Sequence, residues 1–270
     1  MPPPMAEAGL GGIGAAWMPA EWDAPARVHG LTTLRGLPGV GVSRPPYHAF
    51  NLADRCGDDP EAVAENRRRL QRLAGLPGPP LWLRQVHGTG VCRFDGRMAE
   101  AQVEADAAVT SVAGRVLAVL TADCLPVLLC SRSGDEVAAV HAGWRGLAAG
   151  VIERCVEAMR TAPASLLAWI GPAAGPSAYE VGEEVRAAFV AVHAADARAF
   201  APSRPGHWWC DLPALARARL ARLGVTAVTG GRHCTLSDPS RFFSHRRDGP
   251  TGRMASLVWI APDGQGDGPR

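Results

Sequence analysis

Short apolar runs of strand length alternate irregularly with longer amphipathic stretches along this chain. Runs rich in Val, Leu, Ile and Ala and bounded by Gly, Pro or charged residues are typical of β-strands. They occur at residues 26–34, 80–88, 116–130, 136–143, 165–171, 226–231 and 254–260. Apolar residues recur at helical spacing over residues 59–75, 146–161, 182–200 and 212–224. This order is neither a strict β-α alternation nor a series of hairpins, so we expect an α+β fold with mixed sheets and packed helices.

The pattern also suggests how the chain is divided. Residues 16–262 contain all the predicted elements, without an internal repeat or a Ser/Gly-rich linker, so we expect a single catalytic domain there. The helix after Asp59–Pro60 has a sound start, with Asp as N-cap and Pro at the first helical position. Residues 1–15, MPPPMAEAGLGGIGA, are expected to be a disordered extension or to precede the true start, and residues 263–270 to be a disordered tail.

Composition narrows the classes of function. The net charge of the 270-residue chain is +2, which gives no sign of a nucleic-acid or membrane partner. No apolar stretch approaches the roughly 20 residues that span a bilayer. All 28 basic residues are arginine and none is lysine, which excludes Schiff-base chemistry and a P-loop lysine. Any anion in the site must therefore be held by arginine, backbone N–H groups or a metal.

The seven cysteines are scattered, with no C-x-x-C pair among them. Their odd number and low density argue against a disulfide scaffold, so we expect free thiols and a cytoplasmic location. A structural zinc ribbon is also disfavoured, because it needs paired ligands at short spacing.

Three residues stand out as candidate metal ligands. His87 and His141 each end a predicted strand, and Cys124 interrupts an apolar run. Each residue taken alone fits an ordinary structural role, and a cysteine in a strand is usually part of the core. Together, two imidazoles and a thiolate would form a site for a borderline-soft ion such as Zn²⁺. Three protein ligands would leave a coordination position open, as in catalytic zinc sites.

Longer motifs resemble a known family. The segments LWLRQVHG, ADAAVT, LTADCLPVLL, AAVHAGWRGLAAGVIE, WIGPAAGPSAYEVGEEV and RFFSHRRDGPTGRMASLVWI are similar, in this order, to the YfiH/laccase-domain family. That family is also called polyphenol oxidase or peptidoglycan editing factor, and it includes purine nucleoside phosphorylases. The resemblance extends from Trp17 to Ile260. One departure is RGLPGVGVS, a longer form of the usual R-x-G-G-V-S turn, which affects the placement of the loop 35–43.

The resemblance implies a fold, an activity and a set of residues. The fold would be α+β, related to proteins grouped as cysteine hydrolases. The activity would be phosphorolysis of adenosine, inosine, guanosine and methylthioadenosine, accompanied by adenosine deamination. The resemblance assigns one zinc ion to His87, Cys124 and His141. It also points to a substrate pocket that contains Asn51, Arg67, Gln85 and Arg246.

The residues of this chain can be compared with what phosphorolysis and deamination each require. Phosphorolysis needs a phosphate clamp, for which Arg67, Arg246, Arg247 and Arg253 are the candidates unless the stretch SHRRDGPTGR is only a solvated basic loop. The usual zinc-deaminase signature has a Glu two residues after the His and a downstream P-C-x-x-C, and neither is present. A deaminase site here would be built differently, with Asp123 as its proton carrier or, equally, as a structural cap.

Two other enzyme classes remain open. Cys124 could be the nucleophile and His141 the base of a cysteine hydrolase that edits a peptidoglycan precursor. A bound zinc ion would quench this nucleophile, so metal content separates the two hypotheses. A copper phenol oxidase is disfavoured, because the chain has eight histidines and no H-x-H pair. Adventitious Cu²⁺ at the same nitrogen and sulfur ligands would account for any laccase activity.

Overall fold

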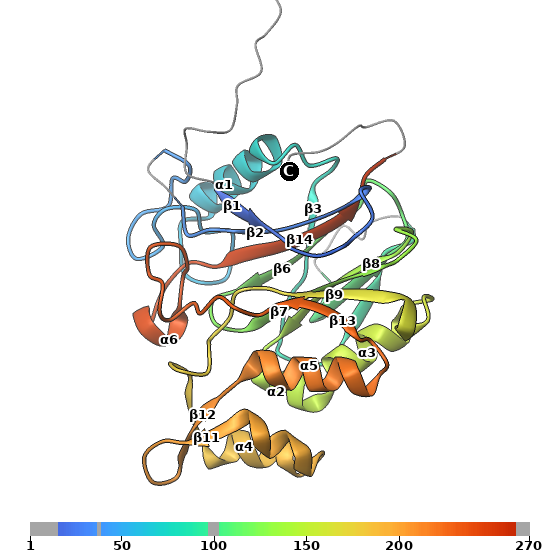
Figure 1. The fold of residues 1–270 in the computed structure, drawn as a ribbon. Helices are drawn as coiled ribbons and strands as arrows, with labels where there is room; N and C mark the ends of the chain where they lie inside the picture. Colours follow the sequence, from blue (N-terminus) through green and yellow to red (C-terminus); the bar gives the residue numbers. More distant parts are fainter. Residues whose placement is uncertain (1–15, 37–38, 97–102, 263–270) are drawn as a thin grey trace, which may run out of the picture.

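Two β-sheets lie face to face in the centre of the molecule, with helices on both outer sides (Figure 1). This computed structural model describes residues 16–36, 39–96 and 103–262. It confirms the predicted α+β class, with mixed sheets and packed helices. The predicted extension and tail, residues 1–15 and 263–270, lie outside the described residues.

The first sheet is antiparallel except at one edge, where β3 runs parallel to β6. Its strands, in spatial order, are β1 (Trp17–Pro19), β2 (Val28–Thr33), β14 (Met254–Ile260), β6 (Val116–Thr121) and β3 (Pro80–Trp82). The sheet thus joins the two ends of the described chain, because the late strand β14 lies between the early strand β2 and the middle strand β6.

The second sheet has antiparallel pairs in its centre and a parallel pair at each edge. Its strands, in spatial order, are β13 (Ala227–Gly230), β9 (Leu166–Ile170), β7 (Leu125–Ser131), β8 (Val137–Ala142), β5 (Ala107–Thr110) and β4 (Val91–Arg93). The central strands β7 and β8 are buried at every position. Such strands read as continuous apolar runs because both of their faces are covered.

The third sheet and the helices surround this core. The small sheet consists of β10 (Glu180–Gly182), β12 (His207–Cys210) and β11 (Phe200–Pro202). The helices are α1 (Pro60–Leu73), α2 (Trp144–Ala149), α3 (Val151–Ala158), α4 (Glu183–Val190), α5 (Leu212–Arg222) and α6 (His245–Asp248), with 3₁₀ turns η1 (Pro163–Ser165) and η2 (Ala194–Ala199). Among the described residues, no helix has both the length and the apolar character needed to cross a membrane.

Successive side chains of β7 point to opposite faces of the strand and pack into two separate apolar cores. Leu128 and Cys130 of β7 point toward the first sheet, where they pack with β6 and β14. Val127 and Leu129 of the same strand point the other way, against α3 and α5. This two-residue period is what a strand buried on both faces requires. On the far side of the first sheet, α1 packs on a separate apolar cluster that contains Leu70.

The run 116–130 was expected to be one strand-like segment, and the structure corrects this. It forms two strands in different sheets, β6 and β7, separated by residues 122–124. The chain turns at Asp123, whose φ is +93°, a value that non-glycine residues rarely adopt. Cys124 therefore lies in the crossing between the sheets and not within a strand.

The predicted helix at 146–161 is also divided. Gly150, with φ +96°, ends α2 and begins α3. Only glycine adopts this left-handed conformation without steric cost, so the break is encoded in the sequence. The predicted strand at 80–88 is shorter than expected, because β3 ends at Trp82 and the chain continues as a loop to His87. The small third sheet was not anticipated.

A buried carboxylate fastens one end of the second sheet. Glu136, which is 2% exposed, accepts bonds from Arg93 Nη2 at 2.8 Å, from the amides of Arg160 and Thr161, and from the Thr161 hydroxyl. Burial alone would raise the pKa of Glu136, but these donors hold it below its usual value. The carboxylate thus ties β4 and the end of α3 to the start of β8.

We expect Glu136→Ala to lower the free energy of unfolding by about 2–4 kcal/mol, because the Arg160 and Thr161 amides lose their acceptor, although Arg93 keeps its second partner Asp95. Glu157→Ala is the control, because Glu157 is an exposed residue that pairs with Arg154 on the surface, and its loss should cost about 0.5 kcal/mol or less. Denaturant unfolding measures both. Since the Glu136 pKa is lowered in the folded state, its contribution should be present at neutral pH and disappear as the pH falls through that pKa. Equal effects of the two variants would contradict the assignment.

Candidate metal centre

Three potential metal ligands converge where the two sheets meet. The ligating atoms of His87, Cys124 and His141 all lie within 4.8 Å of one another. Cys124 Sγ is 3.7 Å from His87 Nε2, and the two imidazole rings meet edge to face with centroids 4.8 Å apart. His141 is buried, Cys124 is half-buried and His87 is exposed, so the group is open to solvent on one side. The structure thus brings together the three residues that the sequence nominated.

Strand register explains why Cys124 and His141 meet. In the β7–β8 ladder Leu125 pairs with Ala142, and Pro126 pairs with His141. Cys124, one residue before β7, therefore lies beside the carboxyl end of β8. His87 reaches the same place from the loop that follows β3, with φ +60°.

A buried carboxylate, Asp106, organises this site. Its Oδ1 lies 2.8 Å from His141 Nδ1 and also accepts the His87 amide at 2.9 Å. Its Oδ2 accepts the amides of Val86 and Gly88 at 3.2 and 2.7 Å. One carboxylate thus orients one imidazole through its ring and the other through its backbone loop.

The position of Asp106 follows from the second sheet. It directly precedes β5, and the pairing of Ala107 with Val140 places it opposite His141. The His141 amide also donates to the Asp106 carbonyl at 2.7 Å. Sequence reasoning missed this residue, although it lies in the segment ADAAVT. The feature of the sequence that could have indicated Asp106 is its place as an acidic residue immediately before an apolar strand.

Asp106 also selects the ring nitrogen that faces the site. Because the carboxylate accepts from Nδ1–H, the Nε2 atom of His141 is left toward Cys124 as the ligand. Burial alone would lower the pKa of His141, but the Cys124 thiolate and Asp106 raise it to about 9. Burial alone would raise the pKa of Cys124, but His141 and His87 lower it to about 6. The two shifts favour a thiolate–imidazolium pair in the metal-free site, from which metal binding would release the imidazolium proton.

Two glycines of the segment HAGWRG make room for this arrangement. A Cβ atom on Gly143 would lie 2.8 Å from His87 Cδ2 and 3.1 Å from Cys124 Sγ. A Cβ atom on Gly146 would lie 2.7 Å from the Gly88 carbonyl oxygen. All three distances are shorter than van der Waals contact, so the His87 loop can pack on α2 only if these positions have no side chain.

Asp123, the residue before Cys124, is buried, and each of its carboxylate oxygens accepts one hydrogen bond. Its Oδ1 accepts the Thr235 hydroxyl at 2.6 Å, and its Oδ2 accepts the Arg246 amide at 2.7 Å. These contacts anchor the turn at Cys124 to α6. They favour the structural role for Asp123 over that of a proton carrier.

Two residues predicted to line the substrate pocket, Asn51 and Gln85, form hydrogen bonds with the backbone of the protein. Asn51 is buried, and its Oδ1 accepts the amides of Ala53 and Arg253. Gln85 forms two bonds with the backbone of Leu120, at 2.7 and 2.8 Å.

Arg67 and Arg246 differ in their charge partners. Arg67 lies over the Trp82 ring, donates to the Leu52 carbonyl and is 3.5 Å from Asp54. Arg246 lies over the Tyr179 ring and has no carboxylate partner among the described residues.

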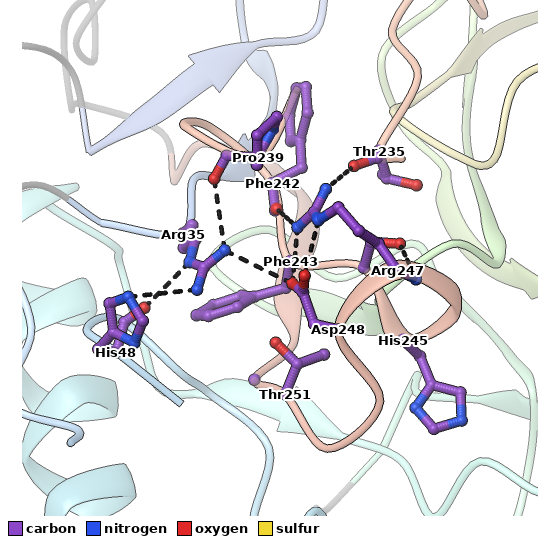
Figure 2. Close-up of polar contacts among 12 residues, drawn as sticks. Arg35, His48, Thr235, Pro239, Phe242, Phe243, His245, Arg247, Asp248 and Thr251 are labelled. Atoms are coloured by element: carbon purple, nitrogen blue, oxygen red, sulfur yellow. Dashed lines mark hydrogen bonds and ion pairs between the residues drawn. The ribbon is translucent and has the colours of Figure 1, made fainter. Parts of the chain in front are cut away.

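The segment that carries Arg246 is fastened by two other arginines (Figure 2). Arg247 reaches the carbonyls of Thr235 and Phe242 and forms a double contact with Asp248. Arg35 approaches the same Asp248 at 3.5 Å and binds His48 on its other side. Figure 2 shows Asp248 between the two guanidinium groups, so the loop that begins at Arg35 is joined to α6.

We expect Asp106→Asn to weaken metal binding by about 10- to 100-fold, as loss of a carboxylate behind a ligating histidine does elsewhere. The amide oxygen of Asn could still accept from the His141 ring and the His87 amide, but its NH2 group would face the Val86 and Gly88 amides, two donors that it cannot accept. Competition of Zn²⁺ between the protein and a chromophoric chelator measures the affinity. Asp135→Asn, at an exposed hairpin position, is the matched control. Wild-type affinity in Asp106→Asn would show that the carboxylate does not position the ligands.

Known proteins resemble this chain over most of its length. Residues 29–261 match the family described as multi-copper polyphenol oxidoreductase laccase. A purine nucleoside phosphorylase of Xylella fastidiosa is 55% identical over 89% of this chain and 95% of its own. The Escherichia coli purine nucleoside phosphorylase YfiH is 49% identical over 89% and 97% of the two chains.

The fold resembles solved structures as well. A crystal structure of the Neisseria meningitidis protein NMB0706 is 44% identical, covers 92% of this chain and 100% of its own, and superposes with a TM-score of 0.86. The family match over residues 29–261 includes His87, Cys124 and His141. This chain therefore belongs to the multi-copper polyphenol oxidoreductase laccase family, in which it is similar to YfiH proteins.

Proposed function

We propose that this chain is a zinc-dependent purine nucleoside phosphorylase. One observation carries the proposal: three metal-ligating atoms lie within 4.8 Å of one another on a side that is open to solvent. The names of the Xylella and Escherichia relatives support the choice of reaction. The proposed substrates are inorganic phosphate and the nucleosides adenosine, inosine, guanosine and methylthioadenosine.

The donor set fits zinc. Two imidazole nitrogens and one thiolate suit a borderline-soft ion, and the low Cys124 pKa of about 6 provides the thiolate at neutral pH. Asp106 also fits a metal site. Its carboxylate is bonded to His141 Nδ1, and such a carboxylate behind the non-ligating nitrogen is the usual support of a histidine that binds metal. A bound divalent ion would supply a fixed positive charge beside the reacting groups.

The reaction joins phosphate to the sugar and frees the purine. An oxygen of hydrogen phosphate forms a bond to C1′ of the ribose. The bond from C1′ to the purine nitrogen breaks, and its electron pair stays on the base. The base gains the proton that hydrogen phosphate loses, so the products are ribose 1-phosphate and the neutral purine. The protein's part is to hold the two reactants in line and to balance their charges.

The residues of this chain would divide these tasks. Asp106 keeps His87 and His141 in place before substrate arrives, so no reorganisation is needed during the reaction. Arg67, held on Trp82 beside Asp54, is proposed to contact the sugar, together with the neighbouring Asn51 segment. Adenosine deamination is proposed as an accompanying activity. We expect it to be the slower reaction, because both oxygens of Asp123 are engaged.

A cysteine hydrolase that edits a peptidoglycan precursor is the second candidate. The observation that favours it is the thiolate–imidazolium pair of Cys124 and His141, which is the resting state of many cysteine nucleophiles. The two functions require different occupants of the same site. Metal bound to the thiolate supports the phosphorylase, whereas a free thiolate supports the hydrolase.

A copper phenol oxidase, which the family description suggests, has less support. The described part of the chain contains one group of potential metal ligands, and it has three members. Multicopper centres use many histidines in H-x-H pairs, and this chain has eight histidines and no such pair. Cu²⁺ would bind the same three ligands tightly, so a weak laccase activity in copper-loaded protein would be adventitious.

The test is product analysis on adenosine and inosine, with and without phosphate, for metal-loaded protein. Ribose 1-phosphate should form only when phosphate is present. Cys124→Ser should lose both metal and nucleoside turnover, because a hydroxyl is a far poorer zinc ligand than a thiolate. Cys92→Ser, which changes a half-buried thiol outside the site, should keep both.

Two results would overturn the proposal. Free ribose released at the same rate without phosphate would identify a nucleoside hydrolase. A Cys124→Ser protein that keeps its metal, together with inactivation of the metal-saturated wild type by a thiol alkylator, would identify Cys124 as a covalent nucleophile.

A further inference from the structure

A cleft of about 420 Å³ lies beside the metal centre, between α2, α6 and the small third sheet. Its walls include two aromatic residues, Trp144 and Tyr179, and three arginines, Arg145, Arg204 and Arg246. Its volume is within the range of small-molecule sites and exceeds that of a phosphate ion, so part of a second reactant would also fit.

Two connections place this cleft next to the metal ligands. Trp144 and Arg145 directly follow Gly143, whose Cβ atom would lie 3.1 Å from Cys124 Sγ. On α6, which also lines the cleft, the Arg246 amide donates to Asp123, the residue before Cys124. Trp144 and Arg145 therefore follow a residue that packs against Cys124, and Arg246 is bonded to the residue that precedes Cys124.

The charges of the cleft are not balanced. Arg204 is paired with Glu180 at 3.0 Å, and the same carboxylate accepts the Ser203 hydroxyl at 2.5 Å. Arg145 and Arg246 have no carboxylate within ion-pair distance in the described part of the chain. The other acidic residue of the wall is Glu184, at the start of α4. Two unpaired cations thus face one remaining anion.

Aromatic rings hold the two unpaired arginines in place. The Arg145 guanidinium lies 4.3 Å from the centre of the Trp144 ring, and that of Arg246 lies 4.9 Å from the centre of the Tyr179 ring. Arg246 also donates one Nη1–H to the Glu180 carbonyl at 2.6 Å. A ring fixes the position of a guanidinium without neutralising its charge, which leaves the remaining N–H groups available to an incoming anion.

The other arginines nominated as phosphate clamps are already engaged. Arg67 is 3.5 Å from Asp54, and Arg247 forms a double contact with Asp248. Arg253 donates to the carbonyls of Thr251 and Gly252. Of this set, Arg246 alone combines a place in the cleft with an uncompensated charge. The chain contains no lysine that could serve instead.

We propose that the cleft between Arg145 and Arg246 is the binding site for the phosphate co-substrate. This inference rests on the proposed phosphorylase function and assigns one of its two reactants a place. The two guanidinium groups, one on α2 and one on α6, would each donate N–H bonds to phosphate oxygens. Phosphate would then lie on the α2 and α6 side of the metal centre, and the nucleoside would reach it from the side of Arg67.

The experiment is steady-state phosphorolysis of inosine by the metal-loaded full chain, with phosphate varied. Arg145→Gln and Arg246→Gln should each raise the KM for phosphate by about 10- to 100-fold, the loss expected for a charge-assisted hydrogen bond. The KM for inosine should change by less than about threefold. Arg154→Gln removes an exposed arginine paired with Glu157 on α3 and should leave both constants unchanged.

Calorimetric titration with inorganic phosphate in the absence of nucleoside gives a readout that does not need turnover. Wild type and Arg154→Gln should bind phosphate, and the two cleft variants should bind it at least tenfold more weakly. Phosphorolysis with an unchanged phosphate KM in both cleft variants would overturn the inference and leave the proposed function intact. Phosphate binding that depends on Arg145 and Arg246 in a protein that forms no ribose 1-phosphate would overturn the proposed function and leave the anion site.

Discussion

The geometry of the candidate metal centre depends on the bonds of the Asp106 carboxylate. It accepts the ring nitrogen of His141 and three consecutive amides of the His87 loop, from Val86 to Gly88. A fully buried carboxylate is costly unless its lone pairs are used, and here both oxygens accept at least two bonds. The same set of bonds that makes its burial tolerable therefore also orients two of the three ligands. This coupling explains why a non-glycine residue, His87, is held at positive φ.

The centre also requires the whole two-sheet core, because its ligands come from separate elements. Cys124 lies where the chain crosses from the first sheet to the second, and His141 ends a strand of the second sheet. Within this crossing, Asp123 accepts the Arg246 amide and so binds the crossing to α6. Because α6 is in turn held by Arg35 through Asp248, segments from both ends of the described chain support the turn at Cys124 (Figure 2). A substitution that breaks any of these contacts should displace the candidate metal ligands.

Much of this arrangement could be predicted from the sequence, and the rest could not for identifiable reasons. The α+β class followed from apolar patterning. The candidate ligands followed from His87 and His141 at the ends of predicted strands, from Cys124 within an apolar run, and from the resemblance to the YfiH/laccase-domain family. Division of residues 116–130 into two strands could not be predicted, because Asp123 at positive φ is stable only through its long-range contacts with Thr235 and Arg246. Asp106 was missed because its role depends on the β5–β8 register, which pairs residues far apart in sequence. By contrast, the break at Gly150 could have been predicted, since glycine inside an apolar helical pattern is a common helix end.

The central claim is that His87, Cys124 and His141 bind one metal ion, and X-ray absorption spectroscopy of zinc-loaded protein tests it most directly. The account predicts one zinc per chain, with a single sulfur ligand at about 2.3 Å and two imidazole nitrogens at about 2.0–2.1 Å. The remaining coordination would come from a light atom of water or substrate. A zinc spectrum without sulfur, or one that is unchanged in Cys124→Ser, would contradict it.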